Sequence, residues 1–481
     1  MRKNSLLKTG FVVVALCFFT TVTFAQKHYK DLVYPALSSL EVPQIEQVTL
    51  GSGMKVFLLE DHELPLIHIS GRIRSGSIYE SSDKVSLASI VGDVMRTGGT
   101  LTRTGDEIDE ELEHIAASVE TSIGLDSGFA SMSVLKEDLD IGLSILADIL
   151  MNPLFPEDKI ELAKIAQRSA ISRRNDNVRS IAFREFKKLI YGPESVYARY
   201  PEYKTVDGII RQDLVEFHGN FFHPNNVMLA VSGDFDTSLM IKKIEEVFRE
   251  WKSHELQFPE IPVVNYQFRQ TVNVVKKDDT NQTNIYMGHV GGLMNDPDYF
   301  PLVLMNRILG IGFTSRLFRE VRSRQGLAYS VFGTFSAEFD HPGLFYVGCQ
   351  TKSETTVRAI RAMVEQIWKM TQDEVEDEEL EGARESYLNS FIFKFDSKRE
   401  IANRLMTYAY YGYPLEFLQM TKEKIETVTK ADILRVARKH LKPDYLQILA
   451  VGRTQDFDQS LSTLGIVKEI DVTIPTLLLN K

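Results

Sequence analysis

Few residues of this chain are of the types that build a covalent or metal-dependent active site. Of the two cysteines, Cys17 lies in an N-terminal segment that we expect to be cleaved, which leaves Cys349 alone and excludes an internal disulfide or a cysteine-based zinc site. Lipid attachment at Cys17 is the less favoured alternative, because Leu16 is larger than the small residue wanted before a processing site. The best-spaced pair for a metal is Glu110 with His114, which has no third partner and is ordinarily a surface contact.

Other catalytic signatures are missing as well. The sequence contains neither a Gly-Lys-Ser/Thr phosphate loop nor a Gly-x-Ser-x-Gly elbow, so phosphoryl transfer and serine hydrolysis have no basis. The acidic run 373–379 suggests cation binding, but a run that opens a helix is more typical of a solvated face at the favourable dipole end. The tyrosines between 408 and 413 could stack a ligand, although beside Pro414 they more simply cover the edge of a core.

The first 25 residues have the three regions of a secretory signal peptide. Arg2, Lys3 and Lys8 form a basic start without acids, residues 11–24 are apolar or hydroxylated, and Ala25 precedes the expected cleavage site. The apolar stretch is short for a bilayer span. Removing these three cations changes the net charge of the 481-residue chain from −11 to −14, which argues against electrostatic binding of nucleic acid or anionic membranes. We therefore expect an exported protein, periplasmic or secreted, without a transmembrane segment.

The pattern of apolar residues predicts an α+β fold. Alternation predicts strands at 54–60, 67–74, 119–124 and 129–135, and helical spacing predicts helices at 85–96, 104–118, 139–151, 156–175 and 179–191. Thr104 and Glu107 form a capping box at the start of one helix. Neighbouring strands with helices in blocks favour an antiparallel sheet covered by helices on one face.

The chain also repeats itself. Asp213, His223-Pro224 and the apolar run that ends at Gly233 have counterparts at Asp432, Lys442-Pro443 and Gly452, and each pair is 219 residues apart. We therefore predict a signal peptide (1–25), an N-terminal domain (26–251), a proline-containing linker (252–268) and a homologous C-terminal domain (269–481).

Several motifs, taken together, resemble the insulinase/pitrilysin family of zinc peptidases, and specifically the secreted bacterial members built of two homologous domains. The resemblance covers about 48–466, nearly the whole mature chain. It rests on Gly53-Met-Lys-Val-Phe with Glu60 and Pro65, Gly76-Ser-Ile-Tyr-Glu80, Tyr191-Gly192, His223-Pro-Asn-Asn-Val with Gly233-Asp234, and the segment from Leu309 through Arg322 to Gly326-Leu-Ala-Tyr329. It implies two domains that face each other as half of a clam-shell.

The zinc ligands of that family are not present at the matching positions. Active members carry His-x-x-Glu-His on an early helix, where two histidines bind zinc and the glutamate activates water. Residues 86–100 match the flanks of this motif. Ser89 stands at the position of the first histidine, Gly92 at that of the glutamate and Asp93 at that of the second histidine. The distal glutamate ligand corresponds to the neighbourhood of Ala170. We therefore expect no catalytic residue and no zinc in this chain.

The resemblance also implies a pair of residues that is retained. Active members of the family complete their site with an arginine and a tyrosine seven residues later, and these positions are Arg322 and Tyr329. A guanidinium and a phenol can bind a peptide carbonyl and a developing oxyanion. The alternative is that Arg322 merely complements a helix C-terminus and Tyr329 packs on a strand.

Two functions are compatible with this pattern. In the first, the chain is a non-catalytic subunit of a heteromeric zinc peptidase and lends Arg322 and Tyr329 to a zinc-bearing paralogue, the two chains enclosing a peptide substrate or an unfolded polypeptide. In the second, it is a stand-alone peptide-binding or scaffold protein with the same fold and no part in proteolysis. Both make the chain inactive by itself.

Overall fold

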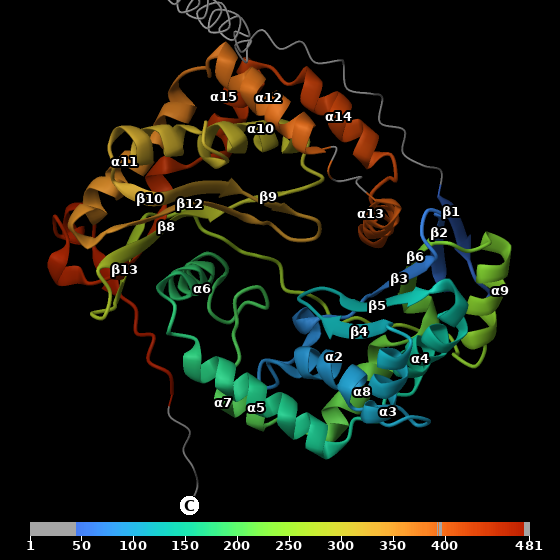
Figure 1. Cartoon of the computed structure of the whole chain (residues 1–481). Helices are drawn as coiled ribbons and strands as arrows, with labels where there is room; N and C mark the ends of the chain where they lie inside the picture. Colours follow the sequence, from blue (N-terminus) through green and yellow to red (C-terminus); the bar gives the residue numbers. More distant parts are fainter. Residues whose placement is uncertain (1–44, 392, 394–396, 476–481) are drawn as a thin grey trace, which may run out of the picture. The chain divides into compact units, whose positions relative to one another are not determined.

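The computed structural model describes residues 45–391, 393 and 397–475 (Figure 1). The predicted signal peptide lies outside these residues. The described residues all belong to one compact unit, Pro43–Lys481. Within them, no helix is long and apolar enough to cross a membrane.

The first half of the chain builds a six-stranded sheet in the order β1-β2-β6-β3-β5-β4. Its strands are β1 (Glu46–Thr49), β2 (Lys55–Glu60), β3 (Leu66–Ile73), β4 (Ser118–Ile123), β5 (Gly128–Leu135) and β6 (Val227–Gly233). Its helices are α2 (Leu87–Thr97), α3 (Gly105–His114), α4 (Leu139–Met151), α5 (Glu157–Arg173), α6 (Val178–Tyr191), α7 (Tyr203–Asp207), α8 (Arg211–Phe221) and α9 (Thr237–Val247). The strands and helices predicted for 54–191 are all present, with ends that differ by a few residues.

The second half builds a six-stranded sheet in the order β14-β7-β13-β8-β12-β10, in which the last five strands repeat the order β2-β6-β3-β5-β4. The outer strand differs, because β14 follows β13 in the chain and runs parallel to β7, whereas β1 precedes β2 and runs antiparallel to it. The strands of this half are β7 (Thr271–Lys276), β8 (Gln282–Val290), β10 (Ala328–Phe335), β12 (Leu344–Lys352), β13 (Gln447–Gly452) and β14 (Val467–Glu469), with β9 (Gly292–Leu293) and β11 (Ala337–Glu338) in a separate pair. Its helices are α10 (Tyr299–Gly310), α11 (Thr356–Gln372), α12 (Asp377–Phe391), α13 (Lys398–Tyr411), α14 (Phe417–Thr427) and α15 (Lys430–His440). Residues 252–270 between the halves contain no helix or strand.

The repeat is visible residue by residue where it was detected in the sequence. Asp213 in α8 and Asp432 in α15 each accept a hydrogen bond at the start of their helix, from the backbone N–H of Ile210 (2.7 Å) and Thr429 (3.0 Å). The strands that follow, β6 and β13, each run parallel to the first long strand of their own half, while most other strand pairs are antiparallel.

Helices cover one face of each sheet, as the sequence predicted, and each half also covers part of the second face of the other sheet, while β4 and β5 keep alternating buried and exposed residues. Helix α6 of the first half packs on β8 and β13 of the second sheet, and α13 of the second half packs on β2 and β6 of the first (Figure 1). A small core joins Ile181, Phe186 and Ile190 of α6 to Tyr286 and Leu449 of the second sheet. This exchange explains why 227–231 of β6 and 448–451 of β13 are continuously apolar rather than alternating, since strands buried on both faces need apolar residues on both.

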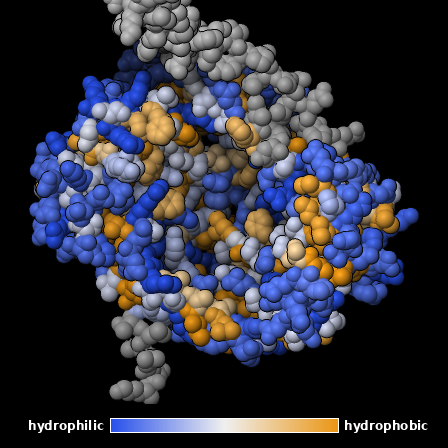
Figure 2. Space-filling model, in the orientation of Figure 1, coloured by the Kyte–Doolittle hydropathy of each residue, from blue (hydrophilic) through white to orange (hydrophobic). Residues whose placement is uncertain are grey.

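The exposed surface is mixed. On the face drawn in Figure 2 hydrophilic side chains predominate, the surface is hollowed near its middle, and hydrophobic side chains occur around the hollow. Hydrogen bonds join the two halves, among them Arg74 Nη2 to the carbonyl oxygen of Tyr410 (3.1 Å) and Tyr410 Oη to that of Asp126 (2.8 Å).

Candidate functional site

Helix α2 carries the three positions at which the family has its zinc motif. The buried carboxylate of Glu80 accepts hydrogen bonds from the backbone N–H groups of Ala88 (2.6 Å) and Ser86 (3.3 Å), and so binds the free donors at the start of the helix. Ser89 and Asp93, four residues apart, share one face of the helix. A helix therefore forms where the family has its zinc motif, although the residues at the ligand positions differ.

Gly92 lies where no side chain fits. A Cβ atom on Gly92 would be 2.6 Å from the backbone nitrogen of Ile123 and 2.9 Å from Cα of Ser122, both in the edge strand β4. The hydroxyl of Thr121 donates a 2.7 Å hydrogen bond to the carbonyl oxygen of Gly92. At the position of the catalytic glutamate, the helix thus packs directly against a strand.

Ser89 is bridged to the neighbouring helix by Gln167. The hydroxyl of Ser86 donates to Oε1 of Gln167 (3.2 Å), and Nε2 of Gln167 donates to the hydroxyl of Ser89 (3.3 Å). Ala170, to which sequence comparison assigned the distal ligand, lies one turn later on α5 and is exposed. Sequence reasoning missed Gln167, and no motif marks it.

Asp93 is the one carboxylate in this group. It is exposed, yet the protein around it removes part of its hydration and thereby raises the pKa of its carboxyl above the usual value. A serine, a glycine, an alanine and one carboxylate do not make a zinc site, which needs three protein ligands. The residues present therefore do not fit the metal.

Arg322 and Tyr329 are brought together at the edge of the second sheet. Arg322 lies on the π-helix Phe318–Arg324 (η5), and Tyr329 lies on the edge strand β10 at a bulge between Ala328 and Ser330. The guanidinium carbon of Arg322 is 5.4 Å from the ring centre of Tyr329 and 4.7 Å from that of Phe318. Tyr329 is 77 % exposed, so its ring is largely open to solvent rather than buried against the sheet.

Arg322 differs from the other arginines of this segment. Arg316 and Arg319 both pair with Glu379 (2.6 and 2.7 Å), and Arg324 pairs with Glu320 (2.5 Å). Among the described residues, Arg322 has no ion pair and no side-chain hydrogen bond. Its five N–H donors are free for a group from outside the chain.

Comparison with known proteins identifies the family. Residues 56–194 match the model for "Insulinase (Peptidase family M16)", and residues 208–387 match "Peptidase M16 inactive domain". The chain belongs to the insulinase family.

Known relatives of this insulinase-family chain cover most of its length. An uncharacterized zinc protease of Rickettsia felis is 24 % identical over 81 % of this chain and 93 % of its own. A Helicobacter pylori protein named a non-peptidase homologue is 22 % identical over 82 % of this chain and 90 % of its own. The crystal structure of a peptidase M16 inactive domain from Pseudomonas fluorescens superposes with a TM-score of 0.78, at 22 % identity, over 87 % of this chain and all of that one, which establishes the fold.

One other group of metal-ligand types occurs among the described residues of this insulinase-family chain. Asp296, Asp298 and His440 bring three ligand atoms within 4.8 Å of one another. The carboxylate of Asp298, however, already contacts Arg435 (2.6 Å) and Lys439 (2.6 Å) as well as His440 (2.8 Å). Because two cations of α15 already bind this carboxylate, we assign Asp298 a structural role in which it attaches α15 to the start of α10.

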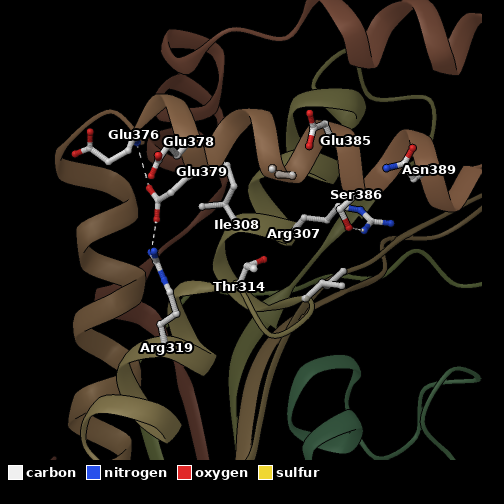
Figure 3. Close-up of a pocket in the computed structure, with 13 residues that line it drawn as sticks. Arg307, Ile308, Thr314, Arg319, Glu376, Glu378, Glu379, Glu385, Ser386 and Asn389 are labelled. Carbon is white, nitrogen blue, oxygen red and sulfur yellow. Dashed lines mark hydrogen bonds and ion pairs between the residues drawn. The ribbon is translucent and has the colours of Figure 1, made fainter. Parts of the chain in front are cut away.

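In the second half of this insulinase-family chain, the space between α10 and α12 corresponds to that between α2 and α5. It contains a pocket of about 610 Å³, lined by Arg307, Ile308, Thr314, Arg319 and residues of α12 (Figure 3). Nη1 of Arg307 donates to the hydroxyl of Ser386 (2.7 Å).

In the predicted acidic run, Glu379 binds arginines of the same domain, so its role is structural rather than cation binding.

Proposed function

We propose that this chain is a non-catalytic subunit of a heteromeric zinc peptidase, and that Arg322 and Tyr329 take part in peptide binding and transition-state support at a partner's zinc site. The observation that carries the proposal is the unpaired guanidinium of Arg322 beside the exposed phenol of Tyr329. Around it, Arg316, Arg319 and Arg324 all have carboxylate partners.

The chemistry of the pair fits this role. A guanidinium presents planar N–H donors that match a carbonyl or an oxyanion, and a phenol can donate one more hydrogen bond to the same group. Such donors contribute most where negative charge develops, as on a peptide carbonyl attacked by water. The activated water itself has to come from another chain, because Ser89, Gly92 and Asp93 offer neither a zinc site nor a general base.

The missing ligand set also supports a role in trans. Because Ser89, Gly92 and Asp93 do not make a zinc site, Arg322 and Tyr329 can support peptide hydrolysis only at the zinc of another chain. A zinc-bearing paralogue of the same family is the partner that this requires, and the signal peptide predicted at the N-terminus supports an exported location for the complex.

The alternative is a stand-alone peptide-binding or scaffold protein. That function makes no demand on Arg322 or Tyr329, so it leaves the unpaired cation without a purpose. The two functions differ in whether a paralogue co-purifies and in whether these two side chains matter.

The test is reconstitution with the zinc-bearing paralogue. We expect the two chains to co-purify, and we expect Arg322→Ala or Tyr329→Phe to lower kcat/KM on unstructured peptides by about 10²-fold, the effect of losing one oxyanion donor. Arg324→Ala, on the same helix but paired with Glu320, is the matched control and should leave the kinetics unchanged. Full activity of both variant complexes would leave the scaffold function as the better account.

A further inference from the structure

Aromatic rings hold the side chain of Arg322. Its guanidinium carbon lies over the rings of Phe318 and Tyr329, at 4.7 and 5.4 Å from their centres. Attraction between a cation and an aromatic face needs no hydrogen-bond acceptor. The contact therefore fixes the position of the charge while the N–H donors stay available.

The helix that carries Arg322 supplies one of these rings. Phe318 and Arg322 are four residues apart on η5, so their side chains lie on the same side of the helix. Backbone N–H of Gln325 donates to the carbonyl oxygen of Glu320 (3.1 Å), five residues back, which is the wide turn of a π-helix. Such wide turns are frequently found at functional sites.

A second ring supports the first. The ring of Phe313 meets that of Phe318 edge-on, with centres 5.0 Å apart and planes at 75°. Phe313 is itself 77 % exposed and follows Gly312, whose φ of +86° is a conformation that favours glycine. The loop thus turns a large apolar side chain toward Phe318 rather than into a core.

We propose that Phe318 is a positioning residue that holds Arg322 in the orientation needed for the substrate, and that Phe313 supports Phe318 in this role. The inference rests on the proposed function of Arg322. Because Phe318 acts through Arg322, removing it has to lower the rate of the chemical step while the contacts that bind the peptide elsewhere persist.

The experiment measures steady-state kinetics of the reconstituted complex. We expect Phe318→Leu, which keeps an apolar side chain but removes the aromatic face, to lower kcat about tenfold with little change in KM. Phe318→Tyr keeps the ring and should stay close to the wild-type kcat. In an Arg322→Ala background, Phe318→Leu should have no further effect, because two residues that act as one unit are not additive.

Outcomes separate this inference from the function on which it rests. Loss of activity in Arg322→Ala with wild-type kinetics in Phe318→Leu overturns the positioning role and leaves the proposed function intact. Wild-type kinetics in Arg322→Ala overturns both. If Phe318→Leu does not assemble, Phe313→Ser decides: this exposed residue is not needed for folding, so we expect about a threefold lower kcat, and an unchanged kcat overturns the proposal.

Discussion

The hydroxyl of Thr121 donates a 2.7 Å hydrogen bond to the carbonyl oxygen of Gly92, and this contact fixes helix α2 against the edge strand β4. Gly92 occupies the position at which active family members have the glutamate that activates water. Loss of the catalytic side chain is thus accompanied by an approach of helix and strand that leaves no space for it.

Gly92→Ala should destabilise the protein. Alanine in a helix is ordinarily favoured over glycine by about 1 kcal/mol, but here its Cβ would meet backbone atoms of β4 at 2.6 to 2.9 Å. Overpacking against backbone costs about 1–3 kcal/mol, so we expect a net loss of stability and a lower Tm. Gly219→Ala is the matched control, since that helical glycine has nothing within 4 Å of its Cβ and should gain about 0.5–1 kcal/mol. Stabilisation by both changes would contradict the steric argument.

Purified protein should contain no stoichiometric zinc. Ser89, Gly92, Asp93 and Ala170 present a single carboxylate at the four family positions, and catalytic zinc sites use three protein ligands. Elemental analysis after mild dialysis checks this, with Asp93→Asn analysed in parallel. About one zinc per chain that disappears in Asp93→Asn would show that the degenerate site binds metal after all.

Stability should depend on the protonation of Glu80. Burial raises the pKa of this carboxyl to about 7, and the hydrogen bonds from Ala88 and Ser86 and the charge of Arg199 oppose the rise only in part. Because the folded chain holds this proton more tightly than the unfolded chain does, protonation of Glu80 stabilises the folded protein. The stabilisation is complete below pH 4.5, the pKa of an ordinary glutamate, and is lost as the pH rises through about 7. The loss for this group is up to about 3 kcal/mol.

Glu80→Gln isolates this effect. The amide keeps an acceptor for the start of α2 but does not titrate, so the free energy of unfolding should fall less between pH 5 and pH 8 in the variant than in the wild type. Urea denaturation at the two pH values measures both slopes. Equal slopes would mean that Glu80 is ionised in the folded protein throughout this range.

Phe186→Ala should weaken the second sheet, although Phe186 belongs to the first half of the sequence. Its side chain is fully buried, with its ring centre 5.9 Å from that of Tyr286 and 6.1 Å from that of Tyr346. Removing a buried phenylalanine costs about 3–5 kcal/mol. Below the denaturation midpoint, hydrogen exchange should therefore quicken in β8 and β13 more than in β3.

Ile145→Ala is the control for that experiment, because Ile145 belongs to the core of the first half. It should quicken exchange in the first sheet instead. If Phe186→Ala made hydrogen exchange faster in the first sheet alone, the packing of α6 on the second sheet would be contradicted.

Local patterns in the sequence determined much of this protein. The strands and helices of the first half followed from apolar periodicity, and the capping box at Thr104 and Glu107 formed as predicted. The 219-residue repeat predicted two homologous domains, and their sheets share the order of five strands. These predictions succeed because each depends either on residues near one another in the chain or on two segments with the same pattern. The motifs around Arg322 and Ser89 likewise indicated the correct family, since their residue types and spacing are themselves properties of the sequence.

Tertiary packing decided what no local pattern encodes. Helices α6 and α13 each cover part of the second face of the other half's sheet, and helical periodicity says which face of a helix is apolar but not which sheet it meets. The bridge from Gln167 to Ser89 joins residues 78 positions apart, and the clash at Gly92 depends on how closely α2 lies to β4. In the same way, the sequence supplied an arginine at position 322, but only the folded chain leaves it unpaired, because Glu379 and Glu320 lie within reach of the arginines on either side of it.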